Sequence, residues 1–260
     1  MILTKLFKLV KWVFSLALIL LISQLSAAQV VNIEKKRKEN KEGFAGVLDL
    51  GFSMLDNGKK IRLFKNNIDL QYNKGKSTFI ILNELNLMTV DNDNLINSGF
   101  QHLRYNYTIR DSGFITVEAF AQHQYNALKL LKKRILTGLG PRLKIIDSKK
   151  LSCYIGLLGM YEYEELTDSL KTITEYVRLG SYISFNWDIT DNLFFNNTTY
   201  YQPAFKYLMN YRISSETNFQ LKITKFLSFK IGLQSTYDTN PPENIQKLFY
   251  LWENVLSYEF

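Results

Sequence analysis

The sequence predicts an all-β protein: an antiparallel up-and-down transmembrane β-barrel of about twelve strands, preceded by a cleaved signal peptide. Three observations support this fold class. The amino terminus has the composition of an export signal, the rest of the chain divides into long segments of alternating apolar and polar residues, and Phe260 ends the last of these segments. Alternation with a period of two residues is typical of a strand with two unlike faces.

The amino-terminal segment is predicted to be a signal peptide. Its basic leader contains Lys5, Lys8 and Lys11, and an apolar run over residues 12–22 follows. This run is about half of the roughly 20 apolar residues that a membrane-spanning helix needs, which argues against a retained anchor. Small residues near its end fit a signal-peptidase site, so we expect cleavage after Ala28.

This interpretation divides the chain into a signal peptide over residues 1–28, a charged periplasmic tail over 29–42 and a barrel over 43–260. The tail mixes lysine with glutamate and is read as solvated. Cys153 is the only cysteine, so the exported protein cannot form an internal disulfide. A closed barrel holds such a chain together with backbone hydrogen bonds, which every membrane-spanning segment must satisfy internally.

Six segments in the first half of the barrel alternate in this way. In the first, Phe44 and Leu48 share one face while Asp49 lies on the other, and Asp56-Asn57-Gly58 then makes a turn. The six predicted strands are Gly43–Leu55, Ile61–Tyr72, Ser77–Val90, Phe100–Arg110, Phe114–Tyr125 and Lys133–Ile146.

Six more segments continue the pattern to the carboxyl terminus. The eighth strand sets Val177 and Leu179 against Arg178, whereas the ninth is aromatic and alternates less regularly. The segments reach or exceed the ~9–11 tilted residues that cross a bilayer, and strands of soluble proteins average ~5–6. The six predicted strands are Leu151–Glu164, Glu175–Ile189, Leu193–Tyr201, Tyr211–Ile223, Leu227–Tyr237 and Leu248–Phe260.

The connections between these strands differ in length. Those after even-numbered strands are short: Asn73–Gly75, Asp111–Gly113, Asp147–Lys150, Thr190–Asn192 and Thr224–Lys225. Apart from the first, those after odd-numbered strands are longer: Asp91–Ser98, Asn126–Lys132, Glu165–Thr174, Gln202–Asn210 and Asp238–Lys247. Short periplasmic turns and long external loops are typical of outer-membrane barrels, so the even-strand turns are assigned to the periplasm.

The faces of the strands predict which side meets lipid. The polar faces carry too many charges of both signs to bury in a dry soluble core. With the apolar face outside, these charges point inward and become the best functional candidates. They could line a narrow polar path, or they could pair across the lumen and plug it. The candidate lumen-lining residues are Arg104, Glu118, Arg134, Arg142, Glu162, Arg178, Glu216 and Glu253.

The last strand is also the predicted assembly signal. Trp252, Tyr258 and Phe260 share its apolar face. We expect the barrel-assembly machinery to recognise this strand, and we expect the strand to close the barrel against the one at Phe44–Met54. Outer-membrane lipid is the other expected partner. Nucleic acid is not expected, because the net charge of +8 forms no basic patch with a suitable spacing.

No catalytic, cofactor or metal site is predicted. A lipid hydrolase needs a serine, a histidine and an orienting polar group. The two histidines, His102 and His123, fall on neighbouring strands and are predicted to point to opposite faces of the sheet. No sequence motif identifies Ser98 or Ser112 as a nucleophile. The segment Asp91-Asn92-Asp93-Asn94 resembles the start of a calcium loop but lacks the downstream glycine and glutamate.

Short motifs through most of the mature chain carry a family resemblance. They are EAFAQHQYN at 118–126, RLGSYISFN at 178–186, YYQP at 200–203, YRI at 211–213, YDTNPP at 237–242 and the terminal aromatic strand. Together they resemble a family of Gram-negative outer-membrane proteins known as domain of unknown function 481, or salt-induced outer-membrane proteins. The resemblance implies a barrel and supplies no catalytic residues.

Three functional hypotheses follow for a protein of the cell outer membrane. The first is a narrow pore for small solutes or ions, which the inward charges and the strand number favour. The second is a closed structural or stress-related envelope barrel without transport. The third and weakest is a lipid-modifying enzyme built around His102 or His123. The sequence does not identify a solute or an oligomeric state.

Overall fold

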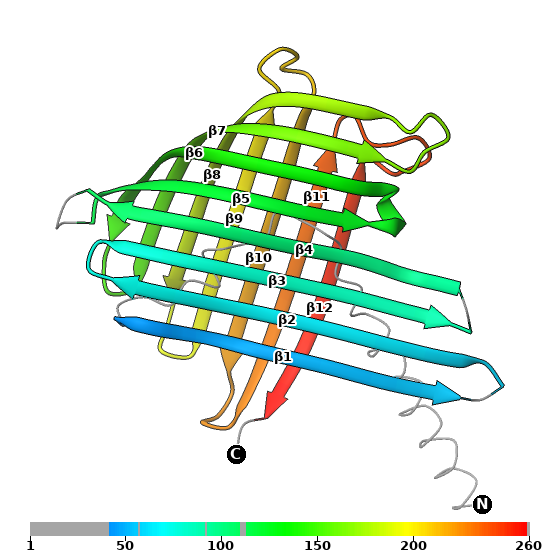
Figure 1. Ribbon diagram of the computed structural model, residues 1–260. Coiled ribbons are helices and arrows are strands. Elements are labelled where there is room, and N and C mark those ends of the chain that lie inside the picture. Colours follow the sequence, from blue (N-terminus) through cyan, green and yellow to red (C-terminus); the bar gives the residue numbers. More distant parts are fainter. Residues whose placement is uncertain (1–41, 57, 92, 110–112, 259–260) are drawn as a thin grey trace, which may run out of the picture.

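The computed structural model describes residues 42–56, 58–91, 93–109 and 113–258. These residues form one sheet of twelve antiparallel strands, in which each strand pairs with the next along the chain (Figure 1). The strands are β1 (Gly43–Asp56), β2 (Lys60–Lys74), β3 (Ser77–Val90), β4 (Asp93–Thr108), β5 (Ile115–Asn126), β6 (Leu131–Asp147), β7 (Leu151–Leu166), β8 (Ile173–Asp188), β9 (Leu193–Pro203), β10 (Tyr211–Lys222), β11 (Leu227–Asp238) and β12 (Leu248–Tyr258). One short 3-10 helix, η1 (Ala127–Lys129), joins β5 to β6.

The strand number, the antiparallel order and the up-and-down topology predicted from the sequence are confirmed. The predicted signal peptide, and the predicted tail up to residue 41, lie outside the described residues. In the described part of the chain, no helix is long and apolar enough to cross a membrane.

The start of β4 corrects one predicted boundary. The sequence predicted a loop over Asp91–Ser98, but β4 begins at Asp93 and pairs with β3 up to Val90. Polar residues such as Asn94 and Asn97 suggested a loop, yet they extend the hairpin beyond its apolar part. A register shift between Met88 and Thr89 absorbs the extra residue, and Asp91 makes the turn with a positive φ of 55°.

This correction weakens the predicted asymmetry of the connections. Longer connections after odd-numbered strands occur only in the second half of the chain, at residues 167–172, 204–210 and 239–247. After β1, β3 and β5 the connections cover only residues 57–59, 91–92 and 127–130, whereas residues 109–114 lie between β4 and β5. We call the end with the odd-strand connections the η1 end, and the opposite end the turn end.

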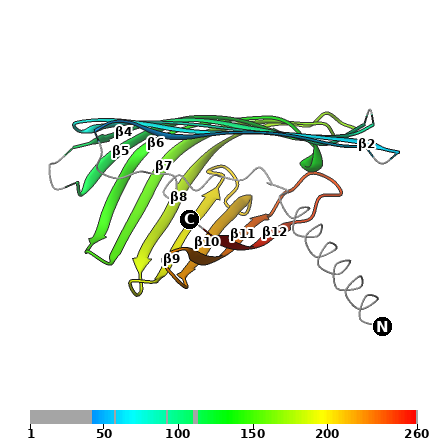
Figure 2. The same cartoon turned by 90° about the horizontal axis from the view of Figure 1, so that it is seen from below.

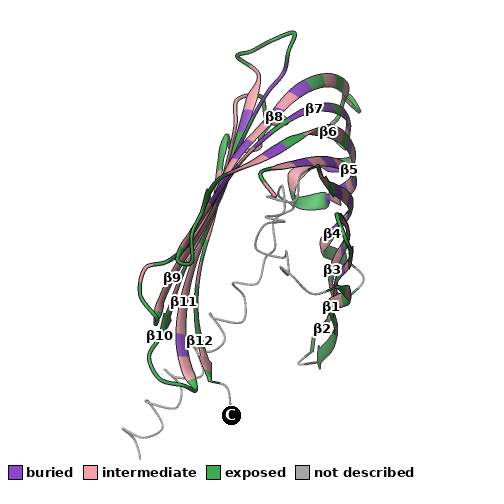
Figure 3. Ribbon diagram, turned by 90° about the vertical axis from the view of Figure 1, so that its left-hand side faces the viewer, coloured by how far each residue is buried: buried purple, intermediate pink, exposed green. Residues whose placement is uncertain are grey.

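The sheet curls so that its first and last strands face each other. Viewed from below, β1 and β2 lie in a flat layer above β9–β12 (Figure 2), and the bend between the two layers passes through β6–β8 (Figure 3). Among the described residues, β1 is hydrogen-bonded to β2 and β12 to β11, and the predicted pairing of the last strand with Phe44–Met54 is not formed. Both edges therefore keep unpaired backbone groups.

The two faces of the curled sheet differ in chemistry. The convex face carries large exposed apolar side chains, such as Leu103, Leu139, Leu157 and Val177. The concave face holds small apolar clusters, one of Ile80, Leu82 and Phe100 and a second of Leu158, Met160, Tyr182 and Tyr200. Between and around these clusters it holds buried charged and amide side chains. The arrangement of apolar outside and polar inside agrees with the sequence-based prediction.

Candidate lumen wall and a pocket at the η1 end

Side-chain contacts between strands that are not neighbours identify the concave face. Tyr182 in β8 donates a 2.7 Å hydrogen bond to Glu118 in β5, and Arg212 in β10 donates one of 2.9 Å to Glu162 in β7. Each contact bridges strands three places apart in the sheet. Because such strands approach each other only on the inner side of a curved sheet, Glu118 and Glu162 lie on the concave face.

The first group of charges surrounds Glu118, whose side chain is completely buried. Arg104 lies 3.2 Å from one of its oxygens and Arg142 lies 3.9 Å from the other. The guanidinium of Arg104 also lies 5.5 Å from the ring centroid of Phe120, and that of Arg142 lies 3.6 Å from that of Tyr154. Two arginines therefore share the Glu118 carboxylate and stack on neighbouring aromatic rings.

The second group surrounds Glu162, which is 1% exposed. Arg178 and Arg212 each lie 2.9 Å from one of its two oxygens, and Arg134 lies 3.8 Å away. Such charge-assisted contacts are the strong form of the hydrogen bond. Three arginines therefore converge on one carboxylate in a region from which water is largely excluded.

Further acceptors hold these arginines from their other sides. Arg134 is also hydrogen-bonded to Glu164, with its Nε 2.6 Å from the carboxylate, and Arg212 lies 2.7 Å from Asp238. Arg178 additionally donates to the backbone carbonyl of Gln202 at 3.1 Å. The three arginines are thus balanced by three carboxylates, which is the condition for keeping ionised groups out of water.

The structure brings together six of the eight residues predicted to line the lumen. Arg104, Glu118, Arg134, Arg142, Glu162 and Arg178 all belong to the two groups above. Glu216 lies further along β10, where it accepts a 3.0 Å hydrogen bond from Asn218. Glu253 in β12 interacts electrostatically with Lys65 in β2, on the facing part of the sheet.

Sequence reasoning missed four members of these groups: Glu164, Tyr182, Arg212 and Asp238. Glu164 lies on the same face of its strand as Glu162, and Arg212 lies on the same face of its strand as Glu216, so the alternation alone would have added both residues. Asp238 was assigned to a loop, although it is the last residue of β11. Tyr182 belongs to the polar face by parity, but an aromatic residue gave no indication that its hydroxyl reaches a carboxylate three strands away.

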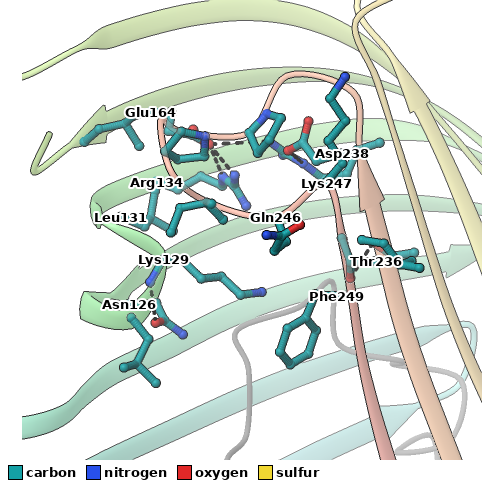
Figure 4. A pocket seen from close by; sticks show the side chains of 18 of the residues that line it. Asn126, Lys129, Leu131, Arg134, Glu164, Thr236, Asp238, Gln246, Lys247 and Phe249 are labelled. Carbon is teal, nitrogen blue, oxygen red and sulfur yellow. Dashed lines mark hydrogen bonds and ion pairs between the residues drawn. The ribbon is translucent and has the colours of Figure 1, made fainter.

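A cavity of about 500 Å³ lies at the η1 end of the concave side (Figure 4). Its wall combines residues from the η1 region with residues of the 239–247 connection and the start of β12. Leu131, Pro242 and Phe249 are among its apolar members, and Lys129, Arg134 and Arg212 supply positive charge. Arg134 and Arg212 also belong to the group of charges around Glu162, so this pocket has an apolar wall on one side and that charged group on the other.

Lys129 bridges two sides of this pocket. Its Nζ lies 4.8 Å from the ring centroid of Phe249, so η1 contacts β12 across the concave side. Burial, together with the nearby charges of Arg134 and Arg212, lowers the pKa of Lys129 to about 8 against the opposing effect of Asp238. A lysine with this pKa changes its charge near physiological pH.

The two histidines lie on opposite faces of the sheet. His102 is on the concave face, with its Nδ1 3.1 Å from Gln122 and its ring stacked on those of Phe100 and Phe120. His123 is on the convex face, with its Nδ1 2.7 Å from Gln101. A single reaction centre containing both histidines is therefore excluded by the parity that the sequence predicted.

Other candidates from the sequence have structural partners or lie outside the described residues. The Asp91 carboxylate accepts a 2.9 Å hydrogen bond from the backbone N–H of Lys60, and so stabilises the β3–β4 turn. In the described ranges, no three His, Cys, Asp or Glu side chains are grouped as metal ligands. Ser112 lies outside those ranges, and so does Phe260 of the predicted assembly signal. Trp252 and Tyr258 of that signal are exposed on the convex face.

Two solved porin structures resemble this fold at low sequence identity. The NanC porin has a TM-score of 0.47 and 10% identity, covering 82% of this chain and 100% of its own. The KdgM porin has a TM-score of 0.40 and 9% identity, covering 78% and 96%. No curated protein matches the sequence. A family model described as "Protein of unknown function, DUF481" matches residues 50–259. The chain therefore belongs to the DUF481 family, which confirms the resemblance seen in the sequence motifs.

Proposed function

We propose that this protein is an outer-membrane β-barrel that forms a narrow pore for small solutes or ions. One observation carries the proposal: the convex face of a twelve-stranded meander is apolar and exposed, while its concave face holds ordered charges of both signs. An exposed apolar surface of this extent is unfavourable in water but suits contact with lipid. The strands contain 11 to 17 residues, which is enough to cross a bilayer with a tilt.

The distribution of the charges favours a pore over a plug. The Glu118 and Glu162 groups are paired along the wall formed by β4–β11. The facing strands add charges of both signs to the concave face, among them Lys65 and Glu253, which are only half-buried and interact electrostatically. A polar path between these two surfaces would allow hydrated solutes to pass and would bias them by charge.

A closed envelope barrel is the second candidate, and one contact favours it. Lys129 reaches Phe249 across the concave side at the η1 end, where a blocked passage would begin. The enzyme hypothesis has no comparable support, because each histidine is held by a glutamine rather than placed beside a nucleophile. We therefore propose a non-enzymatic role.

Conductance measurements separate the two candidates. The folded protein, reconstituted into planar lipid bilayers, should give discrete current steps. The substitution Glu253→Gln removes a negative charge and should move the reversal potential in a salt gradient towards anion selectivity. The substitution Lys65→Gln removes a positive charge and should move it towards cation selectivity. Lys150→Gln, at the exposed turn end, is the matched control and should leave the reversal potential unchanged. Folded protein without current above the empty bilayer would exclude the pore and support the closed barrel.

A further inference from the structure

Four polar side chains cross the convex face of β2–β5 in a continuous line. Asn83 donates to the side-chain oxygen of Asn66, Gln101 donates to that of Asn83 at 3.1 Å, and the other end of the Gln101 amide lies 2.7 Å from Nδ1 of His123. We call these four residues the amide row. Each of its members comes from a different strand, in the order β2, β3, β4 and β5.

The register places the amide row on the side of the sheet that faces away from the charge groups. Asn83 pairs with Gln101, and Gln101 pairs with His123, so these three share one face. Leu103, two residues beyond Gln101 on that face, is 52% exposed, and Ile81 beside Asn83 is 47% exposed. The row therefore interrupts a surface that is otherwise apolar.

Asn66, Asn83 and Gln101 lie at the middle of their strands, whereas His123 lies three residues before the end of β5. Asn83 is at the centre of β3 and Gln101 is at the centre of β4. On the membrane placement proposed above, Asn66, Asn83 and Gln101 are far from both interfaces. Polar groups are rare on a lipid-facing strand surface at this depth, because hydrocarbon offers them no hydrogen-bond partner.

The hydrogen bonds within the row do not use all its polar groups. Among the described residues, Asn66 contributes only its oxygen to the row, and Nε2 of His123 has no partner there. Each amide nitrogen has two hydrogens and each amide oxygen has two lone pairs, so the middle members also keep unused capacity. A lipid tail cannot satisfy these groups, whereas a second polar surface can.

We propose that the amide row is the contact surface for a second copy of this chain within the membrane. Asn, Gln and neutral His side chains both donate and accept, so the row is complementary to itself across a twofold axis. It bears no carboxylate, arginine or lysine that would select a charged partner. The depth of Asn83 and Gln101 excludes lipid headgroups as their partner, because headgroups lie at the interfaces.

The hydroxyl cluster on the convex face of β9 and β10 is the natural comparison. There Asn197 donates to Ser215 at 3.1 Å and to Thr217 at 2.8 Å, and Thr199 lies 2.9 Å from Ser215. These side chains form a compact network in which they bond mainly to one another. The amide row, in contrast, is a line whose end member Asn66 does not use its amide donor within the row. The proposal therefore assigns the contact to β2–β5 and not to β9–β10.

Cross-linking of the full chain in membranes tests this assignment. With the single cysteine removed by Cys153→Ala, a cysteine is introduced beside the row by Ile81→Cys or, as the control, by Thr199→Cys. Exposure to copper phenanthroline or a short bis-maleimide should convert most of the Ile81→Cys protein into a species of twice the mass. The Thr199→Cys protein should stay at its monomer mass. Equal yields for the two variants, or adducts of another mass, would overturn the proposal.

A second measurement avoids dependence on the introduced cysteine. The triple variant Asn66→Leu/Asn83→Leu/Gln101→Leu replaces the three amides of the row with apolar side chains and keeps His123. Lipid tolerates these leucines, so heat-modifiable folding should be retained. In mild detergent, light scattering or native mass spectrometry should show a dimer for the parent protein and at least a tenfold weaker self-association for the variant. A parent protein that is monomeric, or an unchanged dimer in the variant, would contradict the proposal. Neither result depends on whether the barrel conducts.

Discussion

Replacing Glu162 with glutamine should destabilise the folded protein more than any other single neutralisation in the chain. The change keeps the shape of the side chain but removes the charge on which Arg134, Arg178 and Arg212 converge. Arg134 keeps Glu164 and Arg212 keeps Asp238, whereas Arg178 is left with carbonyl and amide oxygens. Glu162 is 1% exposed, so water does not replace the lost partner.

The expected loss can be stated from this geometry. Breaking a buried ion pair by removing one partner costs about 3–5 kcal/mol. With a denaturant dependence near the upper end of ~1–3 kcal/mol per M, the unfolding midpoint in urea should fall by about 1–2 M. Tryptophan fluorescence and the shift between folded and unfolded bands on gels report this midpoint for protein in lipid vesicles.

Glu165→Gln is the matched control because Glu165 is the neighbour of Glu164 on the opposite face. Its partner Lys132, at 2.6 Å, is 59% exposed, and an exposed pair of this kind contributes about 0–1 kcal/mol. The Glu165→Gln midpoint should therefore stay close to that of the parent. If Glu162→Gln unfolded at the same urea concentration as Glu165→Gln, the convergence of three arginines would not be the stabilising feature that the structure indicates.

Three further predictions test other parts of the fold. Gly156→Ala places a methyl group against the ring of Tyr182, so it should displace the Tyr182–Glu118 hydrogen bond and lower the stability by about 1–3 kcal/mol. A methyl group at Gly159 meets nothing within 4 Å, so Gly159→Ala is the control, and equal urea midpoints for the two variants would contradict this packing. Because burial lowers the pKa of Lys129 to about 8 in the folded state, folding releases its proton between pH 8 and the ordinary lysine range near 10.5. Stability should therefore rise with pH across that window, and Lys129→Met should flatten the rise; the same slope in both proteins would refute it. Deleting Phe260 should lower the amount of heat-modifiable protein in the outer-membrane fraction, and an unchanged amount would contradict its predicted role in assembly.

The alternation of residues was sufficient to predict the strands and their faces. Arg104, Glu118 and Arg178 were placed together on one face because a strand with period two fixes parity even when its ends are uncertain. Parity also separated His102 from His123. These inferences depend only on local pattern, and for that reason they agree with the structure.

Other features depend on contacts that no local pattern records. The start of β4 was misplaced because asparagine and aspartate are common in turns and also occur where a strand extends past its apolar part. The Glu162 group depends on the curvature of the sheet, which brings Arg212 of β10 to a residue of β7. The amide row was likewise not recognised, because Asn66, Asn83 and Gln101 look like isolated exceptions until the register aligns them.

The contacts between strands three places apart indicate that the interior charges have two roles at once. The Tyr182–Glu118 and Arg212–Glu162 bonds join β5 to β8 and β7 to β10, and the bend of the sheet passes through these strands (Figure 3). A long arginine or tyrosine side chain can span the inner side of such a bend, whereas a leucine cannot reach a polar partner there. The side chains that give the concave face its charge therefore also stabilise the bend of the sheet. A variant that neutralises Glu118 or Glu162 would change the shape of a passage together with its charge. Among the described residues, Lys65 and Glu253 interact electrostatically but make no side-chain hydrogen bond across the bend. Their opposite effects on the reversal potential would therefore report charge alone.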